Sequence, residues 1–255
     1  MAWLRRELGY FLAACAYFSR LPVPAWVGFS PEALHAAARY LPAVGLLVGG
    51  IGSAVFVTAH HLWSQPVAVL LALAAMLLAT GAFHEDGLSD TADGLGGGWD
   101  KARILDIMKD SRVGSYGVVA LWLGLSSKLL LLASLPPALV VPALVAGHAV
   151  SRYAALGLMA TLDYARADAS SKARPVAQRL SAGSLGFAAL FALPPLYWLP
   201  APSALLALAL LLLSTLWLAG KCRRWLGGYT GDTLGAVQQV GEIAFYLGLA
   251  AQWRA

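Results

Sequence analysis

Charged residues and cysteines are scarce in this 255-residue chain. Only 12% of the residues are Asp, Glu, Lys or Arg, and the two cysteines, Cys15 and Cys222, lie in unrelated segments. Soluble domains carry about 25% charged residues, so a soluble surface could not be covered by so few. Two separated cysteines exclude a disulfide scaffold and show no metal-ligand spacing. The usual glycine-rich nucleotide loops, the GxGxxG and Walker motifs, are absent as well.

Apolar residues make up 59% of the chain, and the mean hydropathy is +0.69. A membrane helix needs about 20 mostly apolar residues, and seven stretches come near that length. We therefore predict an all-α, polytopic membrane helix bundle of about six to eight transmembrane helices, forming one membrane-embedded catalytic domain over residues 1–255. The fifth and sixth stretches are short and are expected to form a hairpin that barely spans. The seven stretches are Leu41–Leu62, Pro66–Phe83, Gly114–Leu135, Pro136–Met159, Ser184–Leu199, Pro202–Ala219 and Leu234–Trp253.

Basic residues are distributed asymmetrically between the two expected sides of the membrane. Most of the 18 Lys and Arg residues fall on one side if the N-terminus is cytoplasmic, and the turns expected on the other side hold none. This positive-inside pattern places the N-terminus in the cytoplasm and makes residues 1–40 a cytoplasmic or interfacial segment, with a helix over Trp3–Phe18. The formal net charge of +5 includes no clustered basic arm, so nucleic acid is not an expected partner.

Seven of the 13 acidic residues lie between Glu85 and Asp110, in a segment expected to be a cytoplasmic acidic loop over residues 84–113. If the second span continues as a helix, Asp86, Asp90 and Asp93 share one face, because they are spaced at i, i+4 and i+7. Such a stack of like charges is unfavourable without a cation. Oxygen ligands favour Mg²⁺ or Mn²⁺. The alternative is an ordinary solvated acidic loop.

A divalent cation beside a membrane suggests phosphate chemistry. Lys109 and Arg112 follow the acidic cluster and could bind a second phosphate, although interfacial anchoring is an equal alternative. Asp232 begins the last span, where it could be a helix cap, part of the site, or both. Ionisable residues also occur within the expected spans, and these are functional candidates by default. They are Lys128, which could pair with Glu242 or reach the interface, and His148 and Arg152, which share one helix face.

Four motifs occur in a characteristic order, and together they resemble the adenosylcobinamide-GDP ribazoletransferase (cobalamin synthase) family. The resemblance covers nearly the whole chain, from Phe18 to about Glu242. The motifs are FSRLPVP (18–24), HEDGLSDTADGLGGG (84–98), IMKDSRVGSYG (107–117) and GGYTGDTLGA (227–236).

The resemblance implies a multi-pass enzyme of the bacterial inner membrane that requires Mg²⁺. Such an enzyme joins α-ribazole, or its 5′-phosphate, to adenosylcobinamide-GDP and releases GMP. Other cobalamin-pathway enzymes and a second copy of the chain are possible partners. The resemblance implies that Asp86, Asp90 and Asp93 are catalytic residues and metal ligands, with His84 as a further catalytic residue and Glu85 as a further ligand. It also implies that Asp110 and Arg112 bind phosphate. Their positions in the chain add Asp232 to the metal ligands, and Lys109 and Arg152 to the phosphate-binding residues.

Two other functions remain open at this level. A lipid-synthesising CDP-alcohol phosphotransferase also places acids at a membrane edge, but its acidic motif differs from the ADG-LGGG run found here. A transporter would suit the ionisable residues within the spans. However, most acids lie at the membrane edge, and no repeated halves are evident.

Overall fold

The computed structural model describes residues 2–166 and 179–251. Within these ranges the chain forms α-helices and short 3₁₀ turns, without a β-strand longer than a single bridge between Tyr164 and Tyr229, so the all-α prediction is confirmed. The helices are α1 (Ala2–Phe18), α2 (Pro31–Ala37), α3 (Leu41–His60), α4 (Gln65–Thr80), α5 (Phe83–Gly97), α6 (Lys101–Ile107), α7 (Ser115–Ser134), α8 (Pro137–Thr161), α9 (Ala182–Ala192), α10 (Ala201–Trp225) and α11 (Gly231–Leu249).

Four helical segments of the described chain are long and apolar enough to cross a membrane: Pro31–His60, α7, α8 and α10. A fifth is added if α4 and α5 are counted together. This count is lower than the predicted six to eight spans for two reasons. The fifth stretch is only the 11-residue helix α9 followed by a 3₁₀ turn that begins with two prolines. The seventh stretch forms the continuous helix α11, but buried polar side chains interrupt its run of apolar residues. Its predicted end at Trp253 lies outside the described residues.

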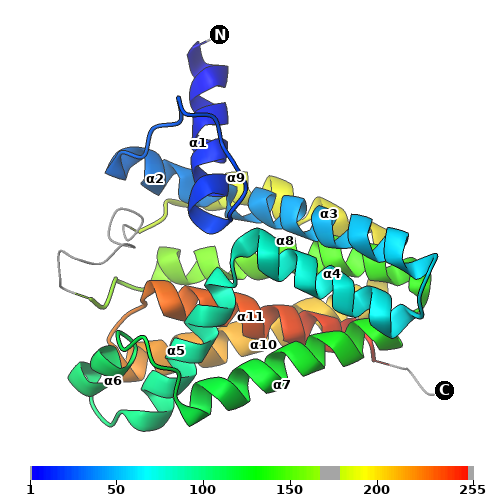
Figure 1. Ribbon diagram of the computed structural model, residues 1–255. Coiled ribbons are helices and arrows are strands. Elements are labelled where there is room, and N and C mark those ends of the chain that lie inside the picture. Colours follow the sequence, from blue (N-terminus) through cyan, green and yellow to red (C-terminus); the bar gives the residue numbers. More distant parts are fainter. Residues whose placement is uncertain (1, 167–178, 252–255) are drawn as a thin grey trace.

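Helices α8 and α11 lie in the middle of the bundle (Figure 1). Of the apolar segment of α8, 72% is buried, against 22% for α7 and 28% for α10, so α7 and α10 present most of their surface to lipid. Glycines let α3 approach α8 closely, because a Cβ atom at Gly49 would lie 2.9 Å from the backbone oxygen of Leu144. Small residues serve this purpose widely in membrane helix packing.

A sharp bend between α4 and α5 positions the acidic segment. The two helices meet at 88°, and both residues of the bend, Gly81 and Ala82, have left-handed backbone conformations, with φ of 64° and 57°. As a result α5 lies across one end of the bundle, beside the first turn of α11 (Figure 1). The prediction of a loop over residues 84–113 is therefore wrong, because most of the segment is helical in α5 and α6. We treat α5 as lying outside the spans, because it carries four carboxylates.

The N-terminal segment projects from the bundle (Figure 1). The predicted helix over Trp3–Phe18 is confirmed as α1, whose Glu7 pairs with Arg39 and accepts a hydrogen bond from the hydroxyl of Tyr40 at 2.7 Å. The segment is also tied to the bend, since the backbone N–H of Arg20 donates to the carbonyl of Ala79 at 2.8 Å. These contacts hold the end of α1 close to the start of α5.

Candidate active site

Helix α5 presents its acidic residues at different depths, although their spacing puts them on one face. Asp86 is exposed, Asp90 is half-buried and Asp93 is buried. The helix packs tightly on the start of α11, because a Cβ atom at Gly87 would lie 2.7 Å from the backbone oxygen of Asp232. The close approach at Gly87 brings Asp86 and Asp90 near Asp232, although Asp232 lies 145 positions after Gly87 along the sequence.

Asp93 joins α5 to α7. Its two carboxylate oxygens accept hydrogen bonds from the backbone N–H groups of Gly114 and Gly117, at 2.8 and 2.9 Å. These are N–H groups at a helix N-terminus, which lack partners within the helix and favour a negative charge. Both glycines are needed here, since a Cβ atom at either would collide with the Asp93 carboxylate. The structure thus gives Asp93 a helix-capping contact, and its predicted role as a metal ligand would require that contact to open.

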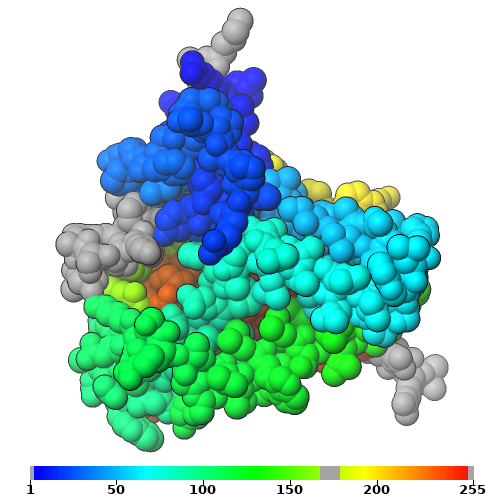
Figure 2. Space-filling model, viewed as in Figure 1, coloured from blue at the N-terminus to red at the C-terminus, as the bar shows by residue number. Residues whose placement is uncertain are grey.

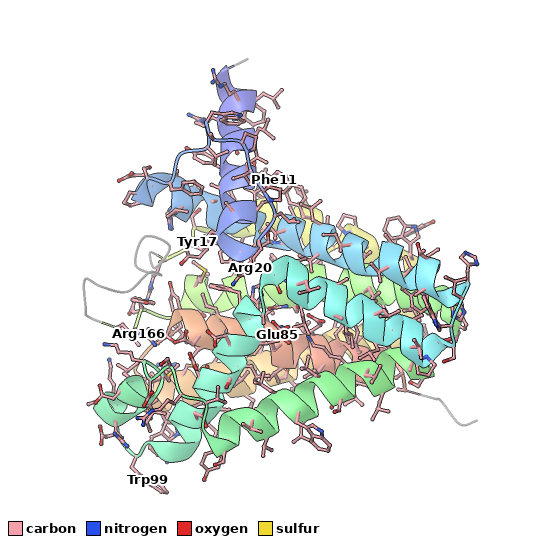
Figure 3. All side chains as sticks on the ribbon, viewed as in Figure 1. Phe11, Tyr17, Arg20, Glu85, Trp99 and Arg166 are labelled. Carbon is pink, nitrogen blue, oxygen red and sulfur yellow. The ribbon has the colours of Figure 1, made fainter. Side chains whose placement is uncertain are left out.

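Glu85 points into the bundle, away from the exposed acids (Figure 3). Its Oε1 accepts a hydrogen bond from Nε2 of Gln239 at 2.9 Å. This placement does not support the prediction that Glu85 shares a metal with Asp86 and Asp90, because its charge is directed to the other side of the helix.

Three predicted ligands remain together where α5 meets the start of α11, and we call this group the acidic mouth: Asp86, Asp90 and Asp232. Burial, together with the charges of Asp86 and Asp232, raises the pKa of Asp90 to about 7. Arg166 offsets part of this negative charge, since its Nη2 lies 2.6 Å from Oδ2 of Asp232. Figure 3 shows Arg166 at this end of the bundle. Arg166 could not be recognised from the sequence as part of the site, since an isolated arginine after a span carries no distinctive pattern.

The described residues contain no group of three His, Cys, Asp or Glu side chains already arranged to hold a metal ion. The chemistry of the Asp86, Asp90 and Asp232 side chains nevertheless fits a hard cation, because all three are carboxylates. Burial, and then repulsion by Asp86 and Asp232, raises the pKa of Asp90. A divalent ion would relieve that repulsion. The Mg²⁺ site stays a prediction, now centred on these three residues.

Asp110 and Arg112 line a separate open cleft of about 1020 Å³ beside α6 and the start of α7. The two side chains form an ion pair at 2.6 Å, and this pair lowers the pKa of Asp110 to about 2. Asp93 also lines the cleft, which therefore reaches α5. Lys109 is exposed on the same turn. The structure thus gathers the predicted phosphate-binding residues Lys109, Asp110 and Arg112 at the acidic end of the bundle.

A network of charged and polar side chains is buried between α7, α8 and α11. Lys128 Nζ lies 3.0 Å from Glu242 Oε1 and donates to Gln239 Oε1 at 2.6 Å. Glu242, which is fully buried, also accepts hydrogen bonds from Gln238 and from Tyr246. The pairing of Lys128 with Glu242 was one of two alternatives left open by the sequence and is confirmed.

Arg152 belongs to the same buried region rather than to the open end of the bundle. It is 1% exposed, and its Nη1 contacts Nδ1 of His148 at 2.7 Å and the backbone oxygen of His148 at 3.1 Å. This position does not support the predicted contact with a pyrophosphate entering from the cytoplasm, because the charged group lies deep inside the protein.

His84 lies between the buried network and the acidic mouth. It is 4% exposed, and neither ring nitrogen has a hydrogen-bond partner among the described residues. Its side chain lines two cavities, one shared with Lys128 and Glu242 and one shared with Tyr17 and other aromatic residues. His84 is therefore only two positions from Asp86 in the sequence, but its side chain faces the interior of the protein.

Comparisons with known proteins are consistent along the whole chain. Residues 10–250 match the family described as cobalamin-5-phosphate synthase. The chain is 48% identical over 265 residues to an adenosylcobinamide-GDP ribazoletransferase of Leptothrix cholodnii, covering 99% of both chains. It is 45% identical over 252 residues to the protein of that name in Shewanella frigidimarina, covering 98% of this chain and 96% of the relative. No solved structure matches.

These matches favour a transferase over the lipid enzyme and the transporter considered from the sequence. The extent of the match is decisive, since it includes the bent α4–α5 segment, the turn before α7 and the start of α11, which carry the clustered acids. This chain is a multi-pass helical membrane protein and belongs to the cobalamin-5-phosphate synthase family, whose curated relatives are adenosylcobinamide-GDP ribazoletransferases.

Proposed function

We propose that this protein joins α-ribazole, or its 5′-phosphate, to adenosylcobinamide-GDP. In this reaction a free ribose hydroxyl of the acceptor forms a bond to the phosphorus nearest cobinamide; it is not the 5′ oxygen, because that atom carries the phosphate in the 5′-phosphorylated acceptor and keeps it in the product. The bond from that phosphorus to the bridging oxygen breaks, GMP leaves, and the acceptor's proton passes to a base or to solvent. The products are adenosylcobalamin, or its 5′-phosphate, and GMP. The near-complete match to relatives of that name carries this proposal.

The arrangement of charges at one end of the bundle supports the same reaction. Asp86, Asp90 and Asp232 would hold Mg²⁺, which supplies charge neutralisation to the diphosphate when bound. Arg112, at 88% side-chain exposure, stands beside the open cleft and can meet a phosphate oxygen with its planar guanidinium group. The acids and the cleft lie at the same end of the bundle, so one diphosphate substrate could engage both.

The membrane location that we propose is the bacterial inner membrane, with the N-terminus in the cytoplasm. The positive-inside pattern supports this orientation. It places the acidic mouth on the cytoplasmic side, where water-soluble substrates are available. Reporter domains fused to the N-terminus test the orientation, and activity of an exported reporter at that end would overturn it.

The reaction is tested with purified protein, adenosylcobinamide-GDP and α-ribazole, by measuring GMP release as a function of Mg²⁺ concentration. We expect Asp86→Asn and Asp90→Asn each to reduce the rate at limiting Mg²⁺ by more than the 10- to 100-fold typical of outer-shell changes around a metal. Glu32→Gln, at an exposed position of α2 outside the acidic residues and the cleft, is the matched control and should keep the wild-type rate. GMP release that does not depend on Mg²⁺, or that survives both substitutions, would refute the metal assignment. Absence of GMP release by the wild-type protein would refute the function.

A further inference from the structure

A second cavity of about 550 Å³ lies beside the acidic mouth, between α1, α5, α8 and the start of α11. Its walls are mainly apolar and rich in aromatic rings: Tyr17 and Phe18 from α1, Phe83 from α5, and Tyr229 before α11. The rings of Tyr17 and Phe83 lie 6.1 Å apart, and those of Phe18 and Phe83 lie 6.2 Å apart. In the space-filling view, orange atoms of α11 are visible at the bottom of a hollow beside the blue N-terminal segment (Figure 2).

Two buried polar groups in the lining of this aromatic cavity have no partner among the described residues. They are the ring nitrogens of His84, which is 4% exposed, and the hydroxyl of Tyr229, which is 1% exposed. Buried polar groups are nearly always hydrogen-bonded, so each unpaired one requires an explanation. A cavity made only to hold an acyl chain would have no use for unpaired donors. An apolar pocket with a few polar groups is typical of a small-molecule site.

The position of the cavity relates it to the reaction. His84 is followed by Glu85 and Asp86, and Gly231, which also lines the cavity, is followed by Asp232. A ligand lying in the cavity would therefore have one end at the carboxylates of the acidic mouth. Its other end would lie among aromatic rings and apolar side chains such as Met159.

We infer that this cavity binds the bicyclic aromatic base of the nucleoside acceptor, with the free ribose hydroxyl that reacts directed toward Asp86, Asp90 and Asp232. The inference rests on the proposed function and adds the site of the acceptor. The ring N–H of His84 donates to the base nitrogen that is not attached to ribose. Phe83 and Tyr17 contact the faces and edges of the rings, as aromatic pairs commonly do. A corrin macrocycle is far larger than this cavity.

The test compares binding of two probes to the detergent-purified protein without corrinoid: 5,6-dimethylbenzimidazole and 5,6-dimethylindole. The indole has the same shape but replaces the accepting nitrogen by C–H. We expect the wild-type protein to bind the benzimidazole about tenfold more tightly, the factor expected for one buried hydrogen bond. The variant His84→Leu should bind both probes equally. A merely structural histidine would not abolish a difference between these two ligands.

A second substitution examines the aromatic wall without disturbing the interior. Phe83 is 44% exposed, so Phe83→Ala should fold, and we expect it to weaken binding of both probes several-fold and to raise the KM for α-ribazole without changing that for adenosylcobinamide-GDP. Phe29→Ala removes an equally exposed phenyl group outside the cavity and should change neither.

Equal binding of the two probes by wild-type protein would overturn the inference, as would displacement of both by a simple fatty acid with no effect of His84→Leu. These outcomes are distinct from failure of the proposed function. Probe discrimination without GMP release would contradict the function alone, and GMP release without discrimination would contradict the base site alone.

Discussion

Substitution of Asp93 tests whether its carboxylate stabilises the fold by capping α7 or acts in the reaction by binding a metal ion. Asp93→Ala removes both acceptors of the backbone N–H groups of Gly114 and Gly117. Hydrogen bonds to a charged group contribute about 1.5–3 kcal/mol each, and a buried unpaired donor costs about 1–3 kcal/mol. The N–H of Gly117 is buried and that of Gly114 is partly buried, so water can replace the acceptor only at Gly114. The expected destabilisation is therefore about 2–4 kcal/mol.

The assay is thermal unfolding of the detergent-purified protein, followed by the fluorescence of its nine tryptophans. For a chain of this size, 1 kcal/mol corresponds to about 2–4 °C in the midpoint, so Asp93→Ala should unfold roughly 4–16 °C below wild type. Asp86 is exposed, and the structure shows it no comparable contact with another described residue, so Asp86→Asn should unfold within about 2 °C of wild type while losing GMP release.

The two variants thus have opposite expected profiles. If Asp93→Ala kept the wild-type midpoint but required a much higher Mg²⁺ concentration for activity, the capping role derived from the structure would be refuted. Asp93 would then be a metal ligand, as the sequence predicted. The exposed acid Glu32 on α2 provides the matched control, since Glu32→Gln should alter neither stability nor Mg²⁺ dependence.

Three further predictions concern the acidic mouth, the buried network and the bend. The raised pKa of Asp90 means that this carboxyl binds a proton more tightly in the folded state than in the unfolded state. Without Mg²⁺, the stability of the protein should therefore fall as the pH rises from about 4 to 7. The stability of Asp90→Asn should fall less over the same range. Lys128→Met should destabilise the protein by about 3–5 kcal/mol, because Glu242 keeps a buried charge. The double variant Lys128→Met/Glu242→Gln should recover part of that loss. Ala82→Gly should stabilise the protein by about 1 kcal/mol by removing a left-handed alanine.

Thermal midpoints measured with and without Mg²⁺ check all three predictions. For Asp90, saturating Mg²⁺ at pH 8 should raise the midpoint of the wild type more than that of the variant, and equal shifts would contradict the electrostatic argument. For Lys128, a double variant no more stable than the single one would show that the unpaired charge is not the cause. For Ala82, a lower midpoint in the glycine variant would show that the flexibility added to the unfolded chain outweighs the relieved strain.

The helical content and the helix order could be predicted from the sequence, because they depend on the length and local periodicity of the apolar stretches. The bend could not. Nothing in the run Thr80–Phe83 states that both Gly81 and Ala82 adopt positive φ, and alanine rarely does. Without the bend, the acidic residues after α4 would continue as a loop beyond the end of a membrane span. With it, they form a helix lying across the end of the bundle.

The candidate site shows the same limit. Spacing at i, i+4 and i+7 correctly put Asp86, Asp90 and Asp93 on one face of a helix. It could not show that Asp93 would meet the free N–H groups of α7, because that contact joins positions 21 and 24 residues apart. In the same way, the i, i+4 spacing of His148 and Arg152 predicts that they share one face of a helix, but it does not show which way that face points. In the structure this face is directed to the interior of the bundle.

Helix α11 connects the three regions that bear on function. Asp232 lies in its first turn at the acidic mouth, Gln238 lines the aromatic cavity, and Gln239 and Glu242 belong to the buried network. Because a helix is rigid over three turns, the contacts of Glu242 with Lys128 contribute to holding Asp232 in place, together with the packing of Gly87 and the ion pair with Arg166. Those contacts are strong only in a medium of low dielectric constant. A reaction between water-soluble nucleotides can therefore benefit from a membrane protein, since the buried part of α11 holds its exposed first turn against the repulsion of neighbouring carboxylates.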